Sequence, residues 1–258
     1  MGKTIVIVGL GQLGRVFAGG FLRSGFVVVP VNRGDDLDIV AARHPEPLLV
    51  LVAVAEPDLH TVLAALPPQW KKRIGLIQNE LLPRDWERHG VINPTVIPVW
   101  FEKKKGSDAK PLIPSPVFGP ATEAVLAALQ SIDIPCREIP SEQDLAYELV
   151  RKNVYILTTN IAGLRSGGNV GDLWRQQREF ASSVAQEVVQ IQDWLTGQKN
   201  DLARLIEGMA EAIEADPGHL CTGRSAPARL ARALQHADEA RLVVPILRRI
   251  QQAGGTQA

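Results

Sequence analysis

The most constraining feature of the sequence is a glycine-rich hexapeptide between a run of branched apolar residues and a helical pattern. The apolar run is Thr4–Val8, and residues 12–24 carry apolar side chains near helical spacing. A second apolar run covers residues 26–31. Six residues form the hexapeptide: Gly9, Leu10, Gly11, Gln12, Leu13 and Gly14. The order of strand, glycine loop, helix and strand predicts a βαβ unit that binds a dinucleotide.

A dinucleotide-binding loop requires glycine at each of these three positions for a separate physical reason. Gly9 allows a tight turn, Gly11 lets the backbone approach a pyrophosphate, and Gly14 lets the helix pack closely on the strand. Free N–H groups and the positive end of the helix dipole then face the phosphates. We therefore expect residues 9–14 to bind the cofactor. The alternative is a glycine-rich turn in a domain that has lost its ligand.

The residues after the second strand favour NADP over NAD. A carboxylate at this place binds the ribose hydroxyls of NAD. The chain instead has Asn32 and Arg33, and a guanidinium can form paired hydrogen bonds with a 2′-phosphate. Asp35 and Asp36 follow and could make this preference less distinct, or they could begin or cap a short helix that ends at Ala42.

The remainder of the first half predicts an α/β fold. Strand patterns cover residues 48–54, 74–77, 96–101 and 134–137, and helical patterns cover 58–66 and 121–131. This alternation predicts a Rossmann-type parallel sheet that is covered on both faces. Few residues separate Asn32 from Leu48, where a full dinucleotide fold has another strand and helix. We therefore expect an abridged sheet.

Strand patterns nearly vanish after Pro140. Helical patterns cover residues 142–164, 173–195, 201–214, 227–235 and 238–252. The sequence thus predicts a dinucleotide-binding domain over residues 1–140 and an all-helical substrate and dimerisation domain over 141–258. The exposed helices of a short second domain are compatible with a homodimer.

Composition excludes several classes of partner. The chain has 28 basic and 28 acidic residues, so its net charge predicts no nucleic acid or membrane partner. Cys136 and Cys221 stand alone, without the spacing of metal ligands, and we expect no metal. No signal peptide precedes the first strand and no apolar run is long enough to span a membrane, so we expect a cytoplasmic protein.

The dinucleotide loop, the helical second half and several later residues together resemble the ketopantoate reductase (2-dehydropantoate 2-reductase) family. The resemblance implies that NADPH reduces a small 2-oxo acid to a 2-hydroxy acid. It also implies that Asn79, after the strand over residues 74–77, contacts cofactor and substrate. Glu80 stands where the family usually has glycine. Asn79 could instead be a simple turn residue at the end of a strand.

The resemblance further implies a catalytic lysine on the first long helix. Lys152 matches this lysine, and Asn160 matches one of the two asparagines that follow it in the family. Their spacing of two helical turns puts both on one face. Ile156 is apolar where the family has the other asparagine. The alternative is that Lys152 faces solvent on an amphipathic helix, beside Arg151.

A third match lies before a late helix, where the family has a serine that holds the substrate carboxylate. Ser225 is the candidate, and Arg224 could pair with a carboxylate or phosphate. Ser225 could equally be a helix N-cap with Pro227 in the first turn. The family's late acidic residue falls at Asp238 or Glu239.

Two departures keep the function open. Ala55 stands where the family usually has a lysine near the cofactor, and the chain is shorter than typical members. The expected function is an NADP-dependent oxidoreductase acting on a 2-oxo acid or related carbonyl. One alternative is another dehydrogenase of this domain pair, acting on a 3-hydroxyacid or an imine. The other is a binding protein that keeps NADP(H) and has lost catalysis.

Overall fold

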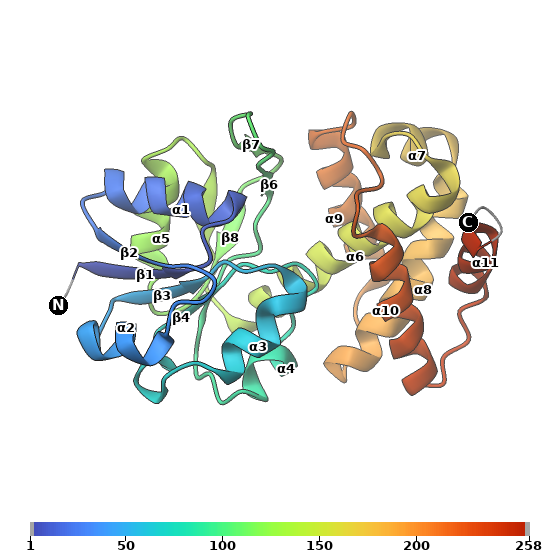
Figure 1. Cartoon of the computed structure of the whole chain (residues 1–258). Coiled ribbons are helices and arrows are strands. Elements are labelled where there is room, and N and C mark those ends of the chain that lie inside the picture. Colours follow the sequence, from blue (N-terminus) through green and yellow to red (C-terminus); the bar gives the residue numbers. More distant parts are fainter. Residues whose placement is uncertain (1–2, 256–258) are drawn as a thin grey trace. The chain divides into compact units, whose positions relative to one another are not determined.

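The computed structural model describes residues 3–255 and contains an α/β unit followed by a helical unit (Figure 1). This confirms the predicted fold class. The two compact units divide between Leu149 and Val150. The division lies inside a helix that begins at Glu142, whereas the sequence analysis put the boundary at 140/141. The reason is that the first turns of this helix, including buried Leu145, pack with the α/β unit.

The first unit contains one five-stranded parallel sheet with the order β2-β1-β3-β4-β5. Its strands are β1 (Thr4–Val8), β2 (Val27–Val31), β3 (Leu49–Val52), β4 (Ile74–Leu76) and β5 (Thr95–Val96). In the register, Val6 of β1 lies between Val29 and Val50. The central strands consist of Val, Ile and Leu because both of their faces are buried. No further strand lies between β2 and β3, so the sheet is abridged as expected.

Helices cover both faces of the sheet, as Figure 1 shows. On one face lie α1 (Gln12–Arg23) and α5 (Thr122–Gln130), and on the other α2 (Leu37–Arg43), α3 (Leu59–Ala64) and α4 (Pro83–Glu87). Two 3₁₀ turns flank α3, at Glu56–Asp58 and Pro68–Trp70. Asp36 caps α2, because its side chain accepts hydrogen bonds from the N–H groups of Asp38 and Ile39.

The second strand is less buried than its sequence predicts. β2 lies at the edge of the sheet, and 58% of Val27 is exposed. The N–H of Val27 donates to Lys3 O, so alternate residues of β2 direct their N–H toward β1. Pro30 falls on the other alternation, where its missing N–H faces the open edge. The missing third strand therefore explains both the exposure and the proline.

Two short strand pairs lie outside the main sheet and correct the sequence assignment. The predicted strand over residues 96–101 splits on either side of Pro98, because proline cannot donate to a ladder. Its second part is β6 (Phe101–Glu102), antiparallel to β7 (Lys110–Pro111). The predicted strand over 134–137 is β9 (Cys136–Glu138), which pairs with β8 (Ser115–Val117).

The second unit consists of helices. They are the remainder of α6 (Glu142–Ser166), then α7 (Val170–Gln176), α8 (Arg178–Thr196), α9 (Leu202–Ala215), α10 (Ala226–Glu239) and α11 (Pro245–Gly255). The predicted helix 173–195 breaks at Gln177, which has a non-helical backbone. The predicted last helix begins only at Pro245, because α10 continues to Glu239 and Arg241 takes a left-handed conformation. None of the helices within residues 3–255 could cross a membrane.

Buried polar contacts hold α6 among its neighbours in this unit. Arg151 is buried and donates to Gly208 O of α9 at 3.0 Å. Asn153 donates to the side chain of Gln192 on α8 at 3.0 Å. Because Arg151 and Asn153 both have partners, α6 can carry these two polar residues inside the helical unit at little cost.

Adjacent glycines on α1 allow a direct test of close helix packing. A Cβ on Gly20 would lie 2.4 Å from Ala128 O of α5, whereas a Cβ on Gly19 would meet nothing within 4 Å. Gly20→Ala should therefore destabilise the protein by about 1–3 kcal/mol through overpacking. Gly19→Ala should stabilise it by up to about 1 kcal/mol through helix propensity. Urea unfolding measures both variants, and equal effects would contradict the close contact.

Two histidines join α3 to the turn after α4. His60 Nδ1 and His89 Nε2 lie 3.1 Å apart, with one of the two donating a hydrogen bond. Burial, together with Arg88, lowers the pKa of both imidazoles, and Lys71 contributes at His89. Asp85 opposes the shift at both residues. The pair is therefore held in its neutral form near pH 7.

This pair should make folding stability depend on pH. The folded pKa values lie below the unfolded value of about 6.5. The unfolded chain thus binds more protons as the pH falls through that value, and the free energy of unfolding decreases on acidification. We expect His60→Gln/His89→Gln to flatten the stability profile between about pH 7 and pH 5. Urea unfolding at a series of pH values checks this, and an unchanged slope would contradict it.

Candidate functional site

The first unit has a cavity of about 620 Å³ at the carboxyl ends of β1, β2 and β3. Its walls come from Gly9–Gly11, from the residues that follow Val31, and from the segment that enters α3. The volume lies in the range of small-ligand and cofactor sites. In open parallel sheets this end of the strands is where ligands bind.

Two of the three loop glycines are required by packing within the protein. A Cβ on Gly14 would lie 2.1 Å from Gly9 O, so α1 could not approach the loop. Gly9 itself has φ +97°, and a Cβ there would lie 3.0 Å from Ala53 O. These contacts fix the loop between β1, α1 and the end of β3.

Packing within the protein does not require a glycine at residue 11. Its φ of −67° is open to any residue, and a Cβ on it would meet nothing within 4 Å. Gly11 lies on the cavity wall at the N-terminus of α1. Its missing side chain leaves open space beside the helix N-terminus, where free N–H groups favour an anion. The loop therefore fits the phosphates of a dinucleotide.

The charged residues of the cavity lie at the end of β2. Asn32 and Arg33 line it, as the sequence analysis expected for cofactor residues. Arg33 Nη2 lies 3.0 Å from Asp58 Oδ2, and the Arg33 side chain is 90% exposed. Asp35 forms no ion pair with Arg33 within the described residues, and its Oδ2 accepts from Asn32 N at 2.6 Å. Asp58 is a site residue that the sequence analysis missed.

The other expected cofactor residues lie beside the cavity. Leu10 lines it, whereas Gln12, Leu13 and Gly14 form the first turn of α1 outside the lining. Asn79 follows β4, and its Nδ2 donates to Glu56 Oε1 at 2.8 Å. This bond joins the ends of β3 and β4.

Glu80 keeps a backbone conformation that suits glycine. Its φ is +60°, in the left-handed region, where a side chain costs about 1–2 kcal/mol. The turn after Asn79 therefore has the shape that a glycine would give it, although the residue is glutamate. This conformation positions Asn79 in the same way that a glycine at residue 80 would.

In the helical unit, Lys152 is the least buried residue of a row along α6 that also contains Ile156 and Asn160. Lys152 is half-buried, and Ile156 and Asn160 are 8% and 9% exposed, above every other residue between 151 and 162. The three residues are spaced at i, i+4 and i+8, so they lie on one line along the helix. The adjacent Arg151 is buried, so the two neighbouring basic residues differ in exposure.

The amide of Asn160 is held by two neighbours. Its Nδ2 donates to Cys221 O at 3.1 Å, and its Oδ1 accepts from Arg229 Nη1 at 2.7 Å. The contact between these elements is close, since a Cβ on Gly163 would lie 2.4 Å from Cys221 Cβ. Arg229 is buried on α10 and was not a sequence candidate, because nothing in the sequence pairs it with a residue of α6.

Cys221 is a packing residue. It is fully buried, and burial together with the nearby Asp172 raises the pKa of its thiol to about 11. A thiol with this pKa stays protonated near neutral pH and is a poor nucleophile. The expectation that Cys221 is a small buried hydrophobic residue thus agrees with its environment.

Ser225 occupies the N-cap position of α10, with Pro227 in the first turn. Its hydroxyl makes no capping hydrogen bond, so the position is that of a cap while the side chain does not act as one. Arg224 is exposed just before it. The structure thus brings Ser225 to the segment that contacts Asn160, whereas the late acidic residues Asp238 and Glu239 lie at the other end of α10.

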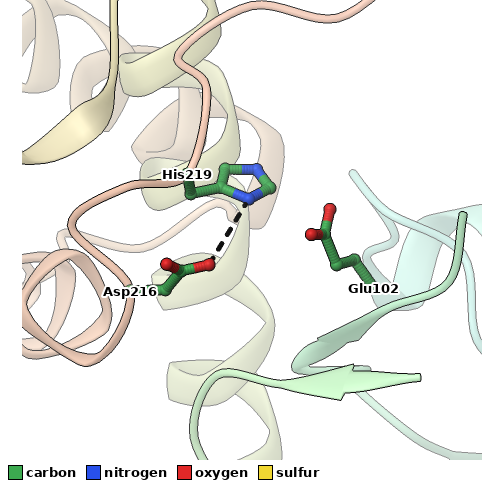
Figure 2. Close-up of side chains that lie close together, drawn as sticks. All are labelled: Glu102, Asp216 and His219. Carbon is green, nitrogen blue, oxygen red and sulfur yellow. Dashed lines mark ion pairs between the residues drawn. The ribbon is translucent and has the colours of Figure 1, made fainter. Parts of the chain in front are cut away.

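The turn between α9 and α10 is held against the connection between α6 and α7. Figure 2 shows its ion pair, in which His219 Nδ1 lies 3.9 Å from Asp216 Oδ2. The carbonyl of His219 accepts from Val170 N, and Cys221 N donates to Gly168 O. These bonds place the residues that precede Ser225. Glu102, also drawn, belongs to β6.

Several solved structures share the fold of this chain. The chain has the fold of the ketopantoate reductases. The 2-dehydropantoate 2-reductase from Methylococcus capsulatus matches with a TM-score of 0.70 and 14% identity, over 98% of this chain and 96% of that one. The dimeric ketopantoate reductase from Staphylococcus aureus has a TM-score of 0.67 and 13% identity, with 98% of each chain covered.

A third similar structure is a D-mandelate dehydrogenase in a ternary complex with NADH and anilino(oxo)acetate. Its TM-score is 0.65 at 11% identity, over 98% of this chain and 97% of that one. No protein-family model matches the sequence, and no curated protein matches it either. The similarity therefore lies in the fold, at identities where sequence comparison finds nothing.

The contrast between Gly11 and Gly14 separates binding from folding. Gly11→Ala should leave thermal stability nearly unchanged, because its Cβ enters open space, yet weaken nucleotide binding at least about tenfold by blocking the phosphates. Gly14→Ala should lower the melting temperature, because its Cβ collides with Gly9 O. Calorimetry and a nucleotide fluorescence titration measure both effects. Unaltered nucleotide affinity in Gly11→Ala would show that the loop holds no phosphate.

Proposed function

We propose that this protein is an NADP(H)-dependent oxidoreductase that reduces a small 2-oxo acid or a related carbonyl compound. The observation that carries the proposal is the open space at Gly11, on the cavity beside the N-terminus of α1. The fold of the ketopantoate reductases supports the same reaction class. Arg33, at the end of β2, supports NADP over NAD.

The residues of the helical unit supply the substrate chemistry in this proposal. Bound NADPH supplies a hydride to the carbonyl carbon. The Lys152 ammonium donates a hydrogen bond to the carbonyl oxygen and stabilises the developing alkoxide. Ser225 and Arg224 hold the substrate carboxylate, and Asn79 orients the partners from the first unit.

Two observations support the choice of Lys152. It is less buried than the residues around it on α6, and its neighbour Arg151 donates to Gly208 O. Asn160, at the other end of the row that contains Lys152, is fixed in orientation by Arg229. It can still order the site through its remaining hydrogen-bonding capacity. A homodimer and a cytoplasmic location remain expectations.

A second candidate function is a binding protein that holds NADP(H) without catalysis. The specific observation for it is that the amide of Asn160 binds Cys221 and Arg229, while Ile156 offers no polar group. Ala55 on the cavity wall also replaces a lysine of the family pattern. Tight NADPH binding without oxidation by any 2-oxo acid, aldehyde or imine would favour this candidate.

The proposal is tested by NADPH binding and by NADPH oxidation with a panel of 2-oxo acids. We expect NADPH to bind and at least one acid to be reduced. With that acid, Lys152→Ala should lower kcat by about 10²-fold or more, because an electrophilic hydrogen bond is lost. NADPH affinity should be unchanged, since Lys152 belongs to the helical unit.

Lys199→Ala is the matched control, because Lys199 is an exposed lysine of the same unit. It should retain full activity. Full activity in Lys152→Ala would remove this lysine from the mechanism. Failure of the wild-type protein to bind either NADPH or NADH would overturn the proposed function as a whole.

A further inference from the structure

The cavity of the first unit contains a charge pair that the dinucleotide motif does not explain. Arg33 and Asp58 both line the cavity, and their side chains are 3.0 Å apart. Among residues 3–255, Asp58 is the sole ion-pair partner of Arg33. The side chain of Arg33 is 90% exposed and that of Asp58 is 47% exposed, so the pair is accessible to a ligand.

The order of the strands brings Asp58 close to Arg33. Asp58 ends the 3₁₀ turn over Glu56–Asp58 and directly precedes α3, which follows β3. β3 lies on one side of β1 and β2 on the other, so the ends of β2 and β3 flank the glycine loop. A carboxylate 25 residues away in sequence thus meets the residue after β2.

The nearer carboxylate cannot take this role. Asp35 also lines the cavity, but its Oδ2 is bound to Asn32 N at the strand end. Asp36 is used as the cap of α2. Asp58 is therefore the carboxylate of this cavity that faces the guanidinium.

We propose that Asp58 sets the cofactor specificity of the cavity by competing with the 2′-phosphate of NADP(H) for the Arg33 guanidinium. A phosphate that forks onto the guanidinium edge that carries Nη2 has to displace the carboxylate from that edge. The phosphate and carboxylate then also repel each other at short range. With NAD(H) no release is needed, and a carboxylate can accept hydrogen bonds from the ribose hydroxyls. This inference rests on the proposed function, because it presupposes nicotinamide dinucleotide binding.

Fluorescence titrations with NADPH and NADH test the role of Asp58. Asp58→Asn should strengthen NADPH binding about five- to tenfold, through relief of competition and repulsion. It should not strengthen NADH binding. Asp38→Asn is the matched control, since Asp38 is an exposed carboxylate of α2 outside the cavity lining, and neither affinity should change.

A double-mutant cycle with Arg33→Gln separates competition from simple repulsion. In the Arg33→Gln background, Asp58→Asn should strengthen NADPH binding less, because no guanidinium remains to be released. An equal gain in both backgrounds, or no gain in either, would overturn the proposed competition. Absence of binding by the wild-type protein would instead overturn the proposed function.

Discussion

The organisation of the first unit depends on backbone contacts at which a side chain has no room. Gly14 lies against the carbonyl of Gly9, and Gly20 lies against the carbonyl of Ala128. These contacts bring α1 down onto the loop after β1 and onto α5. Gly9 N also donates to Val31 O, so the same loop is tied to the end of β2. The cavity is a result of this arrangement, because its walls are the loop and the strand ends that the contacts hold in place.

In the helical unit, buried polar contacts hold the helices together, whereas in the first unit close backbone contacts at glycines do so. Arg229 and the carbonyl of Cys221 fix both ends of the Asn160 amide, and Arg151 binds α9. Such contacts are costly if one partner is missing, so they specify one arrangement of helices. Lys152 is less buried than its neighbours along α6, which are used for packing.

The sequence predicted those elements whose structure depends on residues close together in the chain. The strand over Thr4–Val8, the glycine loop and the cap at Asp36 follow from short-range preferences, and the structure has them. The exposure of β2 could not be predicted, because it depends on which strand is missing beside it. The partners Asp58 of Arg33 and Arg229 of Asn160 were missed for the same reason, since both contacts join distant segments. Glu80 shows the converse, because its left-handed backbone is typical of the glycine that the resembled family has there, while a glutamate by itself does not indicate it.

The position of Pro30 has a consequence for how this fold can change. The open edge of the sheet is where the third strand of a full dinucleotide fold would pair, and a proline offers no N–H to that ladder. An insertion between Asn32 and Leu48 could therefore supply a new strand without giving it a complete set of partners. A substitution of Pro30 would restore the missing donor for such a strand. The proline also hinders the pairing of this edge with a strand of another chain. The abridged sheet is therefore less able to add a strand, whether from its own chain or from a neighbouring molecule.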